Sequence, residues 1–216
     1  MPVRKIPRSH TNVTGRHAVH GARSVGFESV LERDFITLML FDAAFESIEE
    51  QPVKVPVPGG KGRAAYYVPD FLVHLSNARP KLVEVKPSDI LARKADDFHN
   101  KFTAAKAFAG ECGWSFEIWT EKNIRILRLE NAKFLLPYRA RQDVDHGLCA
   151  HLIRQLKIRG EASVSDLAEA VDDQEHLKRL TCLWHLISTN RVFTDVDVPL
   201  TADTVLSLPQ EVRHAV

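Results

Sequence analysis

The sequence predicts an α/β protein, in which a mixed β-sheet is flanked by helices and followed by a smaller, mainly helical domain. Two observations support this fold class. The spacing of apolar residues predicts a helix, then three successive strands, then a second helix and a fourth strand. From about residue 137, helical spacing dominates. The 216 residues are enough for one large domain or two small ones.

The first domain is expected to span residues 25–136 and to open with a helix over residues 28–46. Leu31 and Phe35 begin an apolar series at steps of three to four residues. Ser29 precedes Glu32 by three residues, which is the spacing of a helix-capping box. The next segments are expected to be strands over 48–57, 66–75 and 81–86, a helix over 88–109, a strand over 114–120 and a short edge element over 124–129.

The second domain is expected to span residues 137–216. Val144, Leu148 and Leu152 mark a helix that ends near Gly160. Further helices are expected over 166–171 and 174–189, and short strands over 192–198 and 205–208. Helices followed by a terminal hairpin are typical of a winged-helix domain, so this part is predicted to be winged-helix-like.

Charge is distributed unevenly, although the net charge is only +1. Residues 160–216 contain ten acidic residues and four Lys or Arg, a balance of −6, which leaves +7 for residues 1–159. Residues 1–24 contain basic but no acidic residues and are expected to form a mobile basic arm. The basic front half is therefore suited to phosphate backbones, whereas the acidic end favours a protein partner.

Six basic residues are candidates for phosphate contacts beside a nucleic acid. The alternative for each of them is a solvated surface charge. They are Arg16, Arg23, Lys61, Arg63, Lys94 and Lys101.

The cellular compartment is constrained by what the sequence lacks. No apolar run approaches the roughly 20 residues that a membrane span needs, and the N-terminus has no signal-peptide apolar core. Cys112, Cys149 and Cys182 are odd in number, widely spaced and form no CxxC pair. These features favour a reduced, cytoplasmic protein without a disulfide framework or a zinc finger.

Acidic and basic residues on neighbouring predicted strands form a candidate catalytic site. Asp70 follows Pro69 at the start of an apolar segment, and Glu84 and Lys86 lie two residues apart on the next strand. Strand alternation places Glu84 and Lys86 on the same face of the sheet. Together with Glu32 they form the pattern E…PD…ExK, which is typical of PD-(D/E)XK nucleases and their restriction-endonuclease-like core.

Hard divalent cations such as Mg²⁺, with Mn²⁺ as a substitute, prefer carboxylate and carbonyl oxygens. Asp70 and Glu84 are therefore expected to hold the metal, together with the Val85 carbonyl and Glu32. Lys86 is expected to orient the attacking water or to stabilise charge on the phosphorus. Each residue alone has an ordinary structural reading, and Glu28, one turn before Glu32, is an alternative to it. Their occurrence together on the expected elements favours the nuclease site.

Beyond this pattern, the sequence resembles the TnsA endonuclease subunit of heteromeric, Tn7-type transposases. The matching segments are Phe27–Glu32, Ile48–Pro52, Tyr67–Phe71, Val83–Pro87 and Phe116–Glu121. By motif match, the resemblance implies that the catalytic positions are Glu32, Asp70, Glu84 and Lys86.

The resemblance also implies a task and partners. A TnsA-like subunit cuts the 5′ strand at each transposon end, while a DDE transposase subunit (TnsB-like) cuts and joins the 3′ strands. An AAA+ regulator (TnsC-like) relays target choice, and the acidic second domain is expected to be the part that contacts it.

Two other functions remain open at the level of sequence. A stand-alone PD-(D/E)XK restriction or defence nuclease would have the same site but would recognise its own DNA sequence. A non-catalytic DNA-binding adaptor would keep only the fold. The intact set of acidic residues and lysine disfavours the adaptor.

Overall fold

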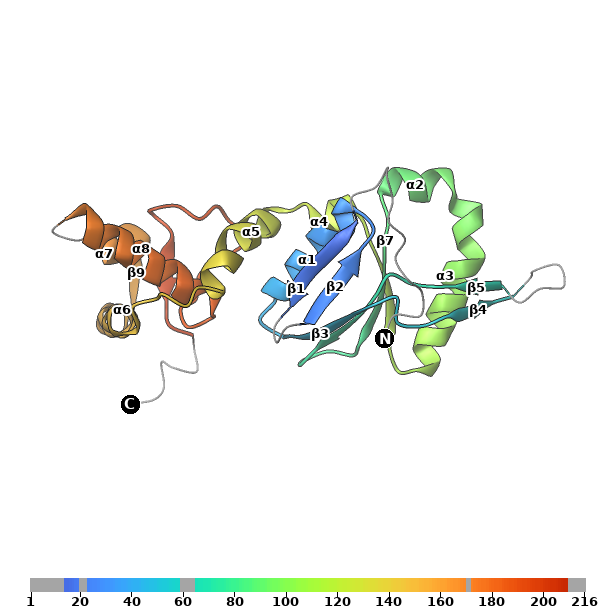
Figure 1. Cartoon of the computed structure of the whole chain (residues 1–216), viewed down its shortest axis with the longest axis horizontal. Helices are drawn as coiled ribbons and strands as arrows, with labels where there is room; N and C mark the ends of the chain where they lie inside the picture. The colour runs from blue at the N-terminus through green and yellow to red at the C-terminus, as the bar shows by residue number, and fades with distance from the viewer. Residues whose placement is uncertain (1–13, 20–22, 59–64, 170–171, 210–216) are drawn as a thin grey trace. The chain divides into compact units, whose positions relative to one another are not determined.

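The computed structural model describes residues 14–19, 23–58, 65–169 and 172–209. The chain divides into two compact units, Met1–Arg125 and Ile126–Val216 (Figure 1). The predicted boundary lay at residue 136, within the helix α5 (Leu127–Arg139). This helix belongs to the second unit because Phe134 on α5 packs edge-to-face on Trp184, with ring centroids 5.2 Å apart.

A mixed four-stranded sheet forms the centre of the first unit, as the sequence predicts. The first three strands in the order β3-β6-β7-β8 are antiparallel neighbours, and β7 and β8 run parallel. A parallel connection needs a crossover, and α2 and α3 provide it. The elements are β3 (Phe45–Glu50), β6 (Phe71–Leu75), β7 (Lys81–Val85), α2 (Ser88–Arg93), α3 (Ala95–Glu111) and β8 (Ser115–Trp119).

Helices pack against both faces of this sheet. On one face, the fully buried Phe35 of α1 (Val30–Phe41) lies 5.5 Å from Phe71 and 5.2 Å from Trp119 between ring centroids. On the other face, Ala109 of α3 packs with Leu72 and Leu82. This division follows from strand alternation, because Phe71 and Leu72 point to opposite faces.

Two predicted long strands are interrupted in the structure. The segment predicted over 48–57 breaks at Gln51, which has a positive φ of 45° and is followed by Pro52. The segment predicted over 66–75 breaks at Pro69, which has no backbone N–H to donate. The detached ends, β4 (Val55–Val57) and β5 (Ala65–Tyr67), pair as a separate antiparallel ribbon.

Two helical predictions also differ from the structure. The helix predicted over 88–109 breaks at Lys94, where φ is −121°, and α3 extends to Glu111. The edge element predicted over 124–129 is wrong, because α4 (Glu121–Ile124) and the start of α5 occupy these residues. The side chain of Thr120 caps α4 through the Lys122 N–H.

The prediction of a mobile arm over residues 1–24 is wrong for its described part. Gly15–Val19 (β1) and Arg23–Phe27 (β2) pair as an antiparallel hairpin. Val25 and Phe27 are buried, so apolar contacts hold the hairpin although its sequence shows no clear periodicity. Residues 1–13 and 20–22 lie outside the described residues.

In its described residues, the second unit consists of helices and one pair of short strands. Its core holds the apolar faces of α6 and α8, including the fully buried Leu152 and Leu183. The strand predicted over 192–198 is reduced to one bridge between Phe193 and Ser207, so the winged-helix arrangement stays a prediction. The elements are α6 (His146–Arg159), β9 (Glu161–Ser163), α7 (Val164–Ala168), α8 (Asp173–Ser188) and β10 (Val205–Ser207), with β9 and β10 antiparallel.

Within the described ranges, no helix has the length and the apolar composition that crossing a membrane requires.

The aromatic contact between α1 and the sheet gives a stability prediction. Phe35→Ala should lower the free energy of unfolding by about 3–5 kcal/mol, because it leaves a cavity between Phe71 and Trp119. Urea unfolding followed by tryptophan fluorescence measures the loss. Tyr66→Ala is the control, since Tyr66 is exposed and should change stability by less than about 0.5 kcal/mol. Equal losses in the two variants would contradict this account of the core.

Candidate active site

Asp70 is fixed to the end of β7 by a main-chain hydrogen bond. It lies directly before β6, and the Val85 N–H donates to its Oδ2 at 2.8 Å. The Asp70 carbonyl accepts a second hydrogen bond, from the Gln51 N–H at 2.8 Å. Asp70 thus joins the start of β6, the end of β7 and the break after β3 at one end of the sheet.

The Lys86 ammonium lies among three oxygens at this end of the sheet. Its Nζ is 2.8 Å from Glu84 Oε1, 3.5 Å from Asp70 Oδ2 and 3.4 Å from the Val85 carbonyl oxygen. Glu84 is only 2% exposed, and its other oxygen, Oε2, accepts from the Tyr67 hydroxyl at 2.6 Å. The structure therefore brings Asp70, Glu84, Val85 and Lys86 together around one positive charge.

Glu32 reaches the neighbourhood of this cluster from the first turn of α1. The Ser29 hydroxyl accepts from the Glu32 N–H at 3.1 Å and so caps α1, as the spacing predicts. The Glu32 carboxylate accepts from the Ser29 hydroxyl at 3.0 Å and from the Glu28 N–H at 2.7 Å, rather than from the Ser29 N–H that a full capping box uses. The Glu28 carboxylate accepts from Gln51 Nε2 at 2.9 Å. In this arrangement the Glu32 carboxylate is bonded to Ser29 and to the Glu28 N–H, and the Glu28 carboxylate is bonded to Gln51.

Burial and neighbouring carboxylates raise the pKa of Asp70 and of Glu32. Burial and the neighbouring Glu84 carboxylate raise the pKa of Asp70 to about 7, against the pull of Lys86. Burial and the nearby Asp70 carboxylate raise the pKa of Glu32 to about 7. Although burial works against the charge of Lys86, Asp70 and Glu84 raise its pKa above the ordinary value. Lys86 is therefore a cation at neutral pH.

The oxygens around Lys86 are suited to a hard metal ion. Two carboxylates and a main-chain carbonyl converge on a point that already attracts a positive charge, and Mg²⁺ prefers this type of donor. Across the described ranges, no three His, Cys, Asp or Glu side chains are arranged to share a metal ion. Glu32 therefore does not join Asp70 and Glu84 as a third carboxylate in this arrangement.

Two residues of the site were not singled out from the sequence. Tyr67 orients Glu84, and burial and the Glu84 carboxylate raise the pKa of its hydroxyl, so it remains a donor. Gln51 is 7% exposed and has a left-handed backbone conformation. Its Oε1 has no hydrogen-bond partner among the described residues. The position of Tyr67 three residues before Asp70 was a usable signal, whereas nothing in the sequence indicates the backbone conformation of Gln51.

The candidate phosphate contacts are scattered over the first unit. Arg16 donates to Ser24 and lies 3.8 Å from Glu50, so it is engaged within the hairpin region. Lys94 is exposed between α2 and α3, and Lys101 lies 5.5 Å from the centre of the Phe98 ring. Lys61, Arg63 and the side chain of Arg23 lie outside the described residues.

The raised pKa of Asp70 predicts a pH-dependent stability. The folded chain holds a proton on Asp70 up to about pH 7, whereas the ordinary value is 3.8. Between these pH values the folded state binds more protons, so the free energy of unfolding should fall as pH rises. The free energy of unfolding is measured by urea titration in EDTA at pH 5 and at pH 8. Between these two pH values, it should fall by on the order of 1–2 kcal/mol more in the wild type than in Asp70→Asn. Identical losses in the two proteins would refute the raised pKa.

Comparison with known proteins gives two family matches. A family described as TnsA-like endonuclease N terminal matches residues 42–121, which contain Asp70, Glu84 and Lys86, while Glu32 precedes the matched part. A family described as TnsA endonuclease C terminal matches residues 123–196. A search of curated proteins gives no match. The two matches follow one another along most of the chain and confirm the resemblance: the chain belongs to the TnsA-like family, the endonuclease subunits of Tn7-type transposases.

Proposed function

We propose that this endonuclease subunit depends on Mg²⁺ and cuts the 5′ strands at transposon ends during cut-and-paste transposition. The observation that carries the proposal is the convergence of Asp70, Glu84 and the Val85 carbonyl on the Lys86 ammonium. This cluster lies within the part of the chain that matches the endonuclease family.

Asp70, Glu84 and the Val85 carbonyl would hold Mg²⁺, or Mn²⁺ in its place. The metal would neutralise charge on the scissile phosphate and on the leaving oxygen. Asp70 would have to lose its proton to bind the metal, so protons compete with the metal at this residue. Glu32 would add an oxygen only after leaving its contacts with Ser29 and the Glu28 N–H.

Lys86 has a different role in this proposal. Because Asp70 and Glu84 keep it protonated, Lys86 cannot accept a proton from water near neutral pH. It can donate hydrogen bonds, and its charge is held in place before the reaction begins. We therefore assign to it the orientation of the attacking water and the stabilisation of negative charge on the phosphorus.

The partners follow from the family and from the charge distribution. A DDE transposase subunit would cut and join the 3′ strands at the same transposon ends. An AAA+ regulator would contact the second unit, because residues 160–216 carry a balance of −6 and would be repelled by DNA. The basic residues of the first unit would face the DNA.

Cleavage of a labelled DNA duplex that contains a transposon end tests the proposal. With Mg²⁺ and the DDE transposase, the wild type should nick the 5′ strand at the element boundary. Asp70→Ala should reduce the nicking rate at least about a hundredfold, because it removes a proposed metal ligand. Asp89→Ala is the matched control, since Asp89 is an exposed carboxylate paired with Arg93 at 2.8 Å.

The same assay separates the alternatives. Robust cutting at unrelated sites by the chain alone would indicate a stand-alone nuclease. Unchanged cutting by Asp70→Ala would show that the site lies elsewhere. An absence of cutting in every combination would favour a non-catalytic adaptor.

Metal binding can be measured without cleavage. Mg²⁺ or Mn²⁺ should raise the melting temperature of the wild type, because a ligand that binds only the folded state stabilises it. The increase should be lost in Glu84→Gln and reversed by EDTA, whereas Glu117→Gln should retain it, since Glu117 pairs with Lys81 away from the site. Equal increases in all three proteins would argue against metal binding at Glu84.

A further inference from the structure

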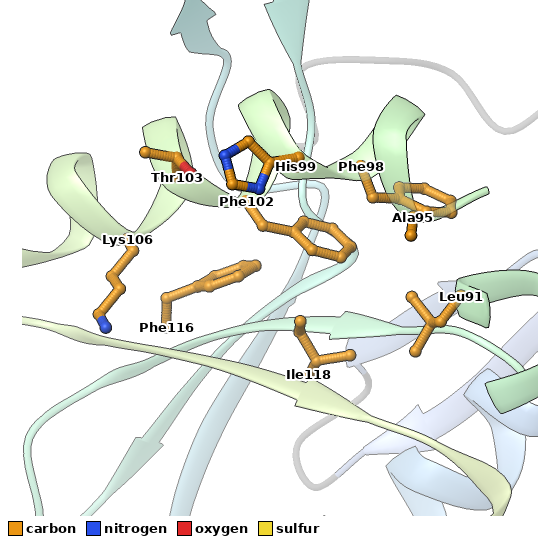
Figure 2. Close-up of a pocket in the computed structure, with 9 residues that line it drawn as sticks. All are labelled: Leu91, Ala95, Phe98, His99, Phe102, Thr103, Lys106, Phe116 and Ile118. Carbon is orange, nitrogen blue, oxygen red and sulfur yellow. The ribbon is translucent and has the colours of Figure 1, made fainter.

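An open groove of about 560 Å³ lies between α3 and the edge strand β8 (Figure 2). Three phenylalanines are among the residues that line it. Phe98 and Phe102 come from α3 and Phe116 from β8, and Phe102 extends from the helix toward Phe116 (Figure 2). The volume falls within the roughly 300–1,000 Å³ of pockets that hold small molecules. The groove can therefore accept a ligand as large as a nucleotide.

The groove opens on the face of the sheet that carries the catalytic carboxylate. In the parallel pairing of β7 and β8, Phe116 is opposite Leu82 and Ile118 is opposite Glu84. Residues opposite one another point to the same face, so Ile118 flanks Glu84. Tyr67 connects the two places, because its hydroxyl donates to Glu84 and its ring centroid lies 6.1 Å from that of Phe102.

The polar residues of the groove favour an anion. Its lining contains Lys106, His99 and Thr103 and no carboxylate. The Lys101 ammonium lies 5.5 Å from the centre of the Phe98 ring. Aromatic rings beside cations and hydroxyl groups are the surface on which single-stranded nucleic acids bind, since bases stack on the rings and phosphates meet the charges. An apolar peptide has no charged group that would pair with these cations.

We propose that this groove holds an unpaired nucleotide of the DNA strand next to the scissile phosphate. This inference rests on the proposed function. Bases of an intact duplex are stacked and paired, so they cannot enter a groove on the protein surface. The groove would therefore favour DNA that is frayed or single-stranded beside the cut. Phe98 and Phe116 would contact the base, and Lys106 the phosphate.

Binding of a fluorescein-labelled oligothymidine of about ten nucleotides to the full chain in EDTA tests this inference. The wild type should bind it more tightly than an abasic oligonucleotide of the same length. Phe98→Leu keeps an apolar side chain but removes the ring, and should weaken binding of oligothymidine between about fivefold and a hundredfold. It should leave binding of the abasic oligonucleotide unchanged.

Matched variants separate the groove from general effects on folding. Phe108→Leu is the control for the ring, because Phe108 is also half-buried on α3 but packs on Trp114 outside the groove. Lys106→Gln changes an exposed residue and should weaken binding of both oligonucleotides while lowering the salt dependence. Lys122→Gln, an exposed change on α4, should have no effect.

Three results would overturn the inference. These are an absence of oligothymidine binding by the wild type, equal binding of the abasic oligonucleotide, and equal effects of Phe98→Leu and Phe108→Leu. If Phe98→Leu spares oligothymidine binding but abolishes association with the DDE transposase, the groove is a protein-docking surface instead.

Different assays test the groove inference and the proposed nuclease function. If the wild type cuts duplex ends in Mg²⁺ but the groove variants bind oligothymidine normally, only the groove inference is wrong. If the groove variants weaken binding but no cutting occurs with any partner, the proposed nuclease function is wrong and the nucleotide site remains.

Discussion

The first unit depends on the placement of one ammonium group among acidic oxygens. Asp70 and Glu84 are held at the start of β6 and the end of β7 by hydrogen bonds from the Val85 N–H and the Tyr67 hydroxyl. Two carboxylates fixed so close together repel one another, and burial strengthens this repulsion. Lys86 offsets it at 2.8 Å from Glu84 and 3.5 Å from Asp70. Lys86 thus offsets the burial of both carboxyl groups, and a substitution of Lys86 would leave the buried Glu84 side chain without its ion pair.

The backbone supplies this placement through two breaks in regular structure. Gln51 turns the chain after β3 and donates its N–H to the Asp70 carbonyl, while Pro69 ends the ribbon strand β5 before β6 begins. A left-handed, non-glycine residue is costly and persists where the surroundings impose it. Here the surroundings are the Glu28 carboxylate and the main chain of Asp70, whose side chain belongs to the cluster around Lys86. The strain is therefore located where it fixes the main chain of Asp70.

The sequence allowed prediction of features that depend on short-range spacing. Glu84 and Lys86 share a face because strand side chains alternate. The Ser29 side chain caps the helix at Glu32 because residues three positions apart lie about one turn apart at a helix N-terminus. Features that depend on distant partners could not be predicted. The hairpin of β1 and β2 needs the burial of Val25 and Phe27, and the contact between Tyr67 and Glu84 needs a break in a segment that reads as one strand. The catalytic roles of Glu32, Asp70, Glu84 and Lys86 remain predictions.

The crossover through α3 explains why a groove lies beside the cluster around Lys86. Parallel pairing of β7 and β8 requires the chain to cross the sheet, and α3 does so over the face that carries Glu84. In the C-terminal half of α3, Ala105 packs with Val55 and Tyr67 of the ribbon, and Ala109 packs with Leu72 and Leu82 of the sheet. Toward its N-terminal end α3 carries Phe98 and Phe102, and the Phe102 ring centroid lies 5.6 Å from that of Phe116 on β8. The same helix therefore closes the core at one end and leaves an aromatic opening at the other, next to the end of the sheet where the acidic groups converge.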